Sequence, residues 1–204
     1  MVAAAALLVF GLWAAYPRRP NLAAFNPDTV ARVDAATWRD YYDKRYLALF
    51  GHLYQLFARE YGYSPLDSLR IALAAAQAAK TFQPTTSRAA AAAATPYLVT
   101  YFGVLAKGAP AAFDIEAAAR TELDWWQARR EHSTGEAYGL TIAKVSTLVL
   151  GRDNARIREA GVRRALAMDY RDARANTMTD ADWAAVGTQL QASYHALRQG
   201  LDGE

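Results

Sequence analysis

The chain has 204 residues, of which 53% are hydrophobic and 21% are charged, and it contains no cysteine. This length is enough for one domain with its own core. The absence of cysteine excludes disulfides, thiol nucleophiles and cysteine-ligated metal centres. Arg18 and Arg19 are two of the 23 basic residues, so residues 21–204 hold 21 basic against 20 acidic side chains. That near-neutral balance argues against a nucleic-acid partner, which usually meets a basic face.

The chain begins with an uncharged apolar run, residues 2–16, that ends at two prolines and two arginines. As a helix it is roughly 22 Å long, shorter than the ~30 Å core of a bilayer. It is open to three interpretations: a membrane anchor, a helix packed on the protein's own core, or a cleaved signal peptide. We expect the anchor, with Trp13 and Tyr16 at the membrane interface and Arg18 and Arg19 beyond it. The arginines then place the bulk of the chain on the cytoplasmic side.

Residues 1–20 are therefore expected to form an apolar N-terminal helix, and residues 21–204 a separate all-α domain. No run combines strand-like alternation with turn residues, and the loops are short, which favours a single compact bundle of about seven helices. Side chains expected to cap helices are Asn26, Asp34, Ser64, Asp114, Asn154 and Thr179. The predicted helices cover residues 27–33, 35–61, 65–82, 89–106, 115–132, 136–150, 155–174 and 180–199.

Two of these segments carry further expectations. Residues 35–61 show two apolar stripes, which predict a long central helix buried on two sides. Residues 89–106 are uncharged and long enough to suggest a second membrane span, but they are rich in alanine and contain Pro96. Because alanine is barely hydrophobic on insertion scales, we predict a buried core helix, with Pro96 starting a new segment or kinking the old one.

The histidines do not form a recognisable metal motif. His52, His132 and His195 lie on separate predicted helices, and neither Glu-x-x-His nor His-Glu-x-x-His spacing occurs. A ferritin-like centre would need His52 and several distant carboxylates, Glu60, Glu122, Asp169 and Asp172, to converge. Pairing of these carboxylates with arginines across the bundle is the commoner arrangement. We therefore expect no metal and no other cofactor.

The densest chemical cluster is residues 122–130, where Glu122 and Trp126 are one turn apart, as are Trp125 and Arg129. Arg129 is placed to lie over the Trp125 ring, and Arg45 is a candidate ion-pair partner for Glu122. Together these side chains suggest a pocket for a flat or anionic ligand. The favoured alternative is a core seam with a charged rim. Further along, five arginines of residues 156–174 predict a basic stripe suited to anionic lipid headgroups, although a solvated helix face is commoner.

No nucleophile motif, phosphate loop or dinucleotide fingerprint is present, which favours a non-enzymatic role. The expected function is that of a non-catalytic, membrane-anchored accessory subunit of a larger protein assembly. Its abundant Trp, Tyr and Arg are residues typical of interface hot spots. The alternative is a helical metal- or small-molecule-binding protein, either enzyme or carrier. Its pocket is then expected near His52, Glu60, Glu122 and Trp126.

Overall fold

Helices form nearly all of the structure, a computed structural model that describes residues 11, 14, 16 and 18–203. The all-α prediction is confirmed, because these described residues form helices and turns and no strand. The helices are α2 Pro27–Tyr42, α3 Tyr46–Gln55, α4 Pro65–Phe82, α5 Arg88–Ala91, α6 Thr95–Leu105, α7 Ile115–Arg130, α8 Gly135–Leu150, α9 Ala155–Asp172 and α10 Asp180–Asp202. The apolar helix expected at the start of the chain falls almost wholly outside the described residues.

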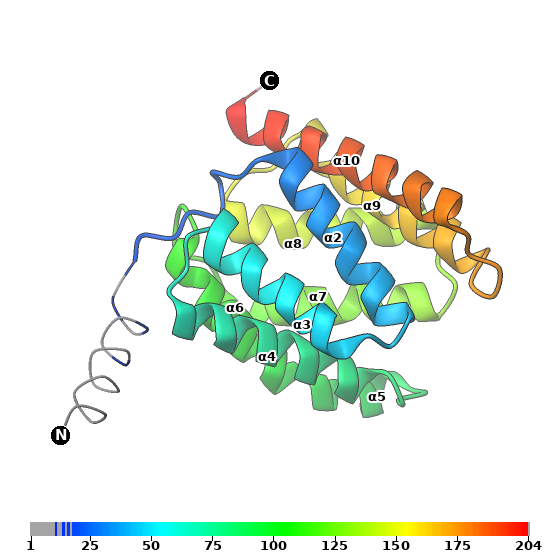
Figure 1. Ribbon diagram of the computed structural model, residues 1–204, viewed down its shortest axis with the longest axis horizontal. Coiled ribbons are helices and arrows are strands. Elements are labelled where there is room, and N and C mark those ends of the chain that lie inside the picture. The colour runs from blue at the N-terminus through cyan, green and yellow to red at the C-terminus, as the bar shows by residue number, and fades with distance from the viewer. Residues whose placement is uncertain (1–10, 12–13, 15, 17, 204) are drawn as a thin grey trace.

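All of these helices except the one-turn α5 form a flattened ring (Figure 1). Each packs on the next in chain order, from α2 on α3 to α9 on α10, and α10 closes the ring by packing on α2. In Figure 1, α10, α2, α3 and α4 form the near layer, and α9, α8, α7 and α6 lie behind them. Side chains from helices distant in sequence therefore meet between the two layers.

Most helices begin where local capping predicts. Asn26, Ser64, Asp114 and Asn154 each accept a hydrogen bond from the backbone N–H three residues ahead. Thr179 forms a reciprocal capping box with the third residue of α10. Pro96 lies in the first turn of α6, so it starts a new helical segment as predicted.

The predicted helices over residues 27–33 and 35–61 are wrong, because Asp34 lies inside α2 and caps nothing. The chain turns instead at Lys44, which has a φ of 59°, and the Arg45 N–H donates to the Asp40 carbonyl at 2.8 Å. This is a Schellman-type helix end with lysine in the position that glycine usually takes. The second half of the predicted helix becomes α3, followed by the π-helical segment η1, Leu56–Glu60.

Helices α8 and α9 approach each other closely at two glycines. A Cβ on Gly161 would lie 2.6 Å from the Ala143 backbone nitrogen, and a Cβ on Gly139 would lie 2.7 Å from Val162 Cα. Backbone atoms cannot move aside as a flexible side chain can. These glycines therefore set the spacing of the two helices and, with it, the position of the inward-facing side chains of α9.

The segment Arg88–Gly108 is the one helical run of the described residues that is long and apolar enough to cross a membrane. It comprises α5, α6 and the short 3₁₀ turns Ala92–Ala94 and Ala106–Gly108. Its inner side chains, among them Leu98, Phe102 and Leu105, belong to the main hydrophobic core. Within this segment, α6 packs on α4 and α7.

Candidate functional site

A cavity of about 300 Å³ lies inside the ring, between α2, α3 and α4 of one layer and α7 and α9 of the other. Its volume is at the lower end of the range found for small-molecule pockets, roughly 300–1,000 Å³. The charged side chains that reach it are Asp34, Glu122, Arg129 and Arg164. Its aromatic walls are Trp38, Tyr41, Tyr42, Phe82, Trp125 and Trp126.

A buried ion pair joins three helices at one side of this cavity. Arg164 of α9 donates to both carboxylate oxygens of Asp34 in α2, and to the Tyr194 hydroxyl of α10 at 3.0 Å. The Tyr194 hydroxyl in turn donates to Asp34 Oδ2 at 2.9 Å. Burial, the largest influence, raises the pKa of Tyr194, so its phenol stays protonated and available as a donor. The three groups therefore satisfy one another's hydrogen bonds at a largely buried position.

Glu122 lies on α7 and faces the same cavity. The Trp126 indole Nε1 donates to Glu122 Oε1 at 3.0 Å, one helical turn away, as the spacing predicts. Burial raises the pKa of Glu122, while the neighbouring indoles of Trp125 and Trp126 and the charge of Arg164 oppose that rise. No lysine, arginine or histidine in the described part of the chain forms an ion pair with it.

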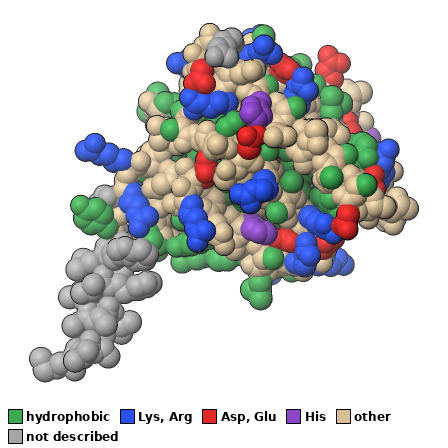
Figure 2. Space-filling model, turned by 45° about the horizontal axis from the view of Figure 1, so that its top comes forward, with side chains coloured by type: hydrophobic (Ala, Val, Ile, Leu, Met, Phe, Trp, Pro, Cys, Tyr) green, Lys and Arg blue, Asp and Glu red, His purple; other side chains and the backbone are tan. Residues whose placement is uncertain are grey.

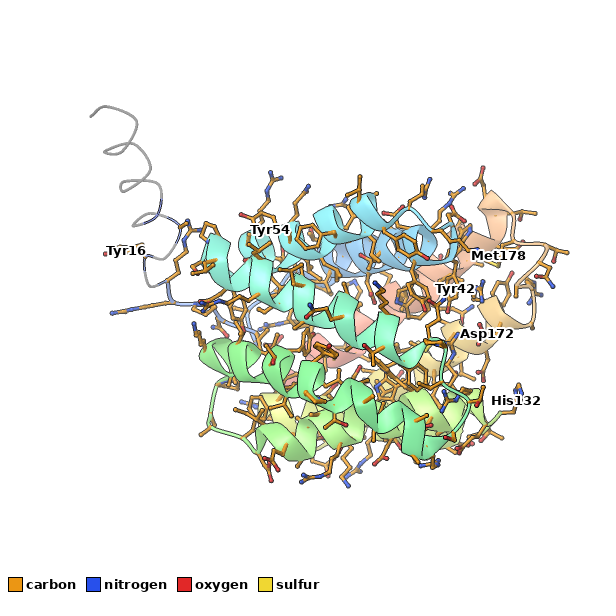
Figure 3. The ribbon with its side chains drawn as sticks, turned by 90° about the horizontal axis from the view of Figure 1, so that it is seen from below. Tyr16, Tyr42, Tyr54, His132, Asp172 and Met178 are labelled. Atoms are coloured by element: carbon orange, nitrogen blue, oxygen red, sulfur yellow. The ribbon has the colours of Figure 1, made fainter. Side chains whose placement is uncertain are left out.

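A second ion pair closes the other end of the cavity. Arg129 Nε and Nη2 donate to Asp172 Oδ2 at 2.9 and 2.7 Å, and Nη2 also donates to the Tyr42 hydroxyl at 2.8 Å. Figure 3 shows Tyr42 and Asp172 at the same end of the ring. The Arg171 guanidinium lies 3.2 Å from the centroid of the Tyr42 ring, on its face. These contacts hold α2, α7 and α9 together around the cavity.

Further cavities adjoin the first. Glu122 and Arg164 also line neighbouring spaces of about 280 and 200 Å³. An apolar cavity of about 440 Å³ lies between α3 and α4 and shares Tyr41, Leu49 and Leu53 with the first one. The interior of the ring is therefore a chain of adjoining cavities around Glu122 and Arg164.

Helix α3 covers these cavities loosely. None of its residues is buried although most are apolar, and Leu47 is 91% exposed. Its tie to α2 is His52, whose Nδ1 donates to the buried Asp40 Oδ2 at 2.8 Å. Arg45 holds the other Asp40 oxygen at 2.8 Å. The α3 helix is thus tied to α2 by polar contacts, and its inner residues Leu49, Phe50 and Leu53 are half-buried where they face the cavities.

The structure brings together Glu122, Trp125, Trp126 and Arg129, four of the seven pocket residues suggested by the sequence. It places the other three, Arg45, His52 and Glu60, outside the residues that line this cavity. Arg45 pairs with Asp40 and Asp43, not with Glu122, and Glu60 accepts the Asn26 N–H at 2.5 Å. Arg129 bonds Asp172 and Tyr42, and no contact of its guanidinium with the Trp125 ring face occurs among the described residues.

The carboxylates considered for a metal centre are dispersed. Asp172 pairs with Arg129, Asp169 accepts from Tyr138, and His52 pairs with Asp40. Within residues 18–203 no group of three or more His, Asp or Glu side chains is placed to hold a metal ion.

The residues expected at a membrane interface are described only in part. Trp13 lies outside the described residues, whereas Tyr16 is 69% exposed and Arg18 and Arg19 are also exposed. On the face seen in Figure 2, basic and acidic side chains are interspersed and no broad basic area is visible.

The predicted basic stripe of α9 is broken up in the structure. Arg164 points inward to Asp34, and Arg156 and Arg163 both pair with Glu159. Arg174 pairs with Asp182. The arginines of this segment therefore do not share one free, solvent-facing surface.

Sequence reasoning missed Asp34 and Arg164 as members of the site. Both stand within apolar stripes: Arg164 follows Ile157 and Gly161 and precedes Met168 at helical spacing, and these three are buried. Asp34 similarly follows the buried Val30. A charged residue at a position of the buried stripe was the available signal, since such a residue needs a partner inside.

Comparisons with known proteins add no further guide: no protein family, no curated protein and no solved structure matches this chain.

Proposed function

We propose that this chain is a helical binding domain whose interior cavity takes a small, largely apolar molecule. The observation that carries the proposal is the cavity of about 300 Å³ with six aromatic side chains and a few convergent polar groups. Such a lining is typical of small-molecule sites, where apolar walls supply affinity and few polar groups fix orientation. The function needs no catalytic group, in keeping with the lack of catalytic motifs in the sequence.

Three features of the ring support this proposal. The ion pairs at Arg164 and Arg129 hold the polar wall in place before any ligand arrives. The alanines of α4, among them Ala75 and Ala79, leave room opposite the tryptophans of α7. The loosely packed α3 provides a cover that can move without disrupting the main core, because its residues are not buried.

Binding of a neutral aromatic probe tests the proposal. We expect 2-naphthalenemethanol to quench the tryptophan emission of the full chain saturably, because Trp125 and Trp126 line the cavity. Filling the cavity by Ala79→Phe should weaken this binding at least about tenfold. The matched control, Ala184→Phe, changes an exposed alanine of α10 and should leave binding unchanged. Equal binding by both variants would place the probe elsewhere and contradict the proposal.

A second function, that of a membrane-anchored accessory subunit, is proposed on different grounds. Besides the apolar residues 2–16, the chain exposes Tyr16, Tyr46 and Leu47 at 69%, 54% and 91%. A contiguous apolar surface is typical of contacts with a partner or a membrane, and Tyr46 and Leu47 are adjacent at the start of α3. In this proposal residues 1–20 attach the chain to the membrane and Arg18 and Arg19 keep the helical domain on the cytoplasmic side.

Two measurements test the second proposal. After extraction in mild detergent, the full chain should co-purify with other subunits, and a single monodisperse species without partners would count against it. Protease applied to vesicles that expose the cytoplasmic face should digest the helical domain. Protection of that domain there would overturn the proposed orientation.

A further inference from the structure

We propose that the molecule bound in the interior cavity carries a protonated amine, which Glu122 accepts while its apolar body lies against the tryptophans of α7. This inference rests on the proposed binding function and names the chemical class of the ligand. It follows from the charges around the cavity and from the faces of its aromatic rings.

The arginines of the cavity wall are already matched by carboxylates. Arg164 is bonded to both oxygens of Asp34, and Arg129 binds Asp172 through two of its nitrogens. A carboxylate ligand would have to compete with these internal partners for either guanidinium. Asp172 is shared with Arg171, whose Nη1 lies 3.1 Å from Oδ1. Each of these arginines therefore already has a carboxylate partner within the protein, which disfavours an anionic ligand.

Of the two described carboxylates that line the cavity, Asp34 forms an ion pair and Glu122 forms none. Its hydrogen bond comes from the neutral Trp126 indole, and no ion pair links it to a basic residue among those the structure describes. When Glu122 is ionised, no ion pair among the described residues meets its charge, and Arg164 acts on it without direct contact. A buried charge of this kind is costly alone and is stabilised by a cation that enters beside it.

The aromatic walls suit the same class of ligand. Arg164 already lies over the Trp38 ring at 5.1 Å and Arg171 over the Tyr42 ring at 3.2 Å, so these walls hold cations within the protein. No arginine or lysine of the described residues lies over the rings of Trp125 or Trp126. Both rings line the cavity beside Glu122, where a cationic ligand would meet them.

Three probes with one naphthalene body separate the possibilities: 2-naphthalenemethylamine, 2-naphthalenemethanol and 2-naphthoate. In calorimetric titrations of the full chain at pH 7, the amine should bind at least about tenfold more tightly than the alcohol. The carboxylate should bind more weakly than the alcohol. Glu122→Gln keeps the shape of the side chain and the oxygen that accepts from the Trp126 indole N–H, but it removes the charge. It should bring the affinity for the amine to within about twofold of that for the alcohol.

Glu116→Gln is the matched control, because Glu116 lies on the same helix and its side chain is 74% exposed. It should keep the full preference for the amine. Glu122→Asp, which retains the charge, serves as a second variant and should keep part of that preference.

The outcomes distinguish this inference from the function on which it rests. If the alcohol binds in the cavity but the carboxylate binds tightest, or all three bind alike, the amine assignment is overturned and the binding function stands. Loss of preference in Glu116→Gln as well would also overturn the assignment. If none of the three probes binds, both proposals fail.

Discussion

Replacing Arg164 by methionine tests whether the buried polar centre is structural as well as part of the cavity wall. Methionine is unbranched and fills much of the same volume, so the change removes the charge with little new cavity. It leaves the Asp34 carboxylate buried, with the Tyr194 hydroxyl as its remaining side-chain donor. The perturbation therefore isolates the ion pair that links α2, α9 and α10.

The expected loss follows from burial. Removing one partner of a buried pair costs about 3–5 kcal/mol, because the other charge loses its compensation. Side-chain exposure is 23% for Arg164 and 11% for Asp34, so some water reaches the pair and the lower end, about 3 kcal/mol, applies. For a chain of this size, each kcal/mol lowers the melting temperature by about 2–4 °C. Arg164→Met should therefore melt about 6–12 °C below the unchanged protein.

Urea unfolding followed by tryptophan emission and circular dichroism measures this loss. The control is Arg163→Met, one residue earlier on α9, which removes an exposed pair with Glu159 and should cost less than about 1 kcal/mol. Adding Asp34→Asn to Arg164→Met should recover at least about 1 kcal/mol, since the stranded charge is then gone. If Arg164→Met and Arg163→Met differ by less than about 0.5 kcal/mol, or the double variant recovers nothing, the assigned role of the pair is refuted.

Three other predictions concern the frame of the cavity. Gly161→Ala should lower the unfolding free energy by about 1–3 kcal/mol, because the added methyl meets the α8 backbone. Gly187→Ala, which adds a methyl in open space on α10, should raise the unfolding free energy by up to about 1 kcal/mol. The urea midpoints of the two variants measure the difference. Burial raises the pKa of Glu122 in the folded state above its ordinary 4.5. The contribution of this group to folding stability is therefore fully present below pH 4.5 and is lost as the pH rises through the folded-state pKa. Glu122→Gln should therefore unfold at higher urea than the unchanged protein at pH 7, and this advantage should vanish at pH 4; a constant advantage would contradict the sign. His52→Ala should speed amide hydrogen exchange in α3 and leave α10 unchanged, because His52 ties α3 to the buried Asp40; equal acceleration in both helices would count against that local role.

Much of the local architecture can be predicted from sequence, because a cap or a helix start depends on residues within one turn. Ser64 with Pro65, Asn154, and Thr179 with Asp182 each fix a helix start through a side chain and a nearby backbone N–H. The contact between Trp126 and Glu122 was predictable for the same reason, since one turn of helix places them side by side.

Only the tertiary structure decides which charged residues face inward and what they meet. Asp34 was expected to cap a helix because aspartate favours that position, but Arg164, 130 residues away, draws it into the ring interior. The break at Lys44 was not predictable from its residue type, because lysine rarely ends a helix in the left-handed conformation. Ion pairs of Arg45 with Asp40 and Asp43 accompany the turn there. The sequence alone determines most helix starts, because a cap is made by local hydrogen bonds. The cavity around Glu122 exists because closure of the ring brings α2, α7 and α9 together.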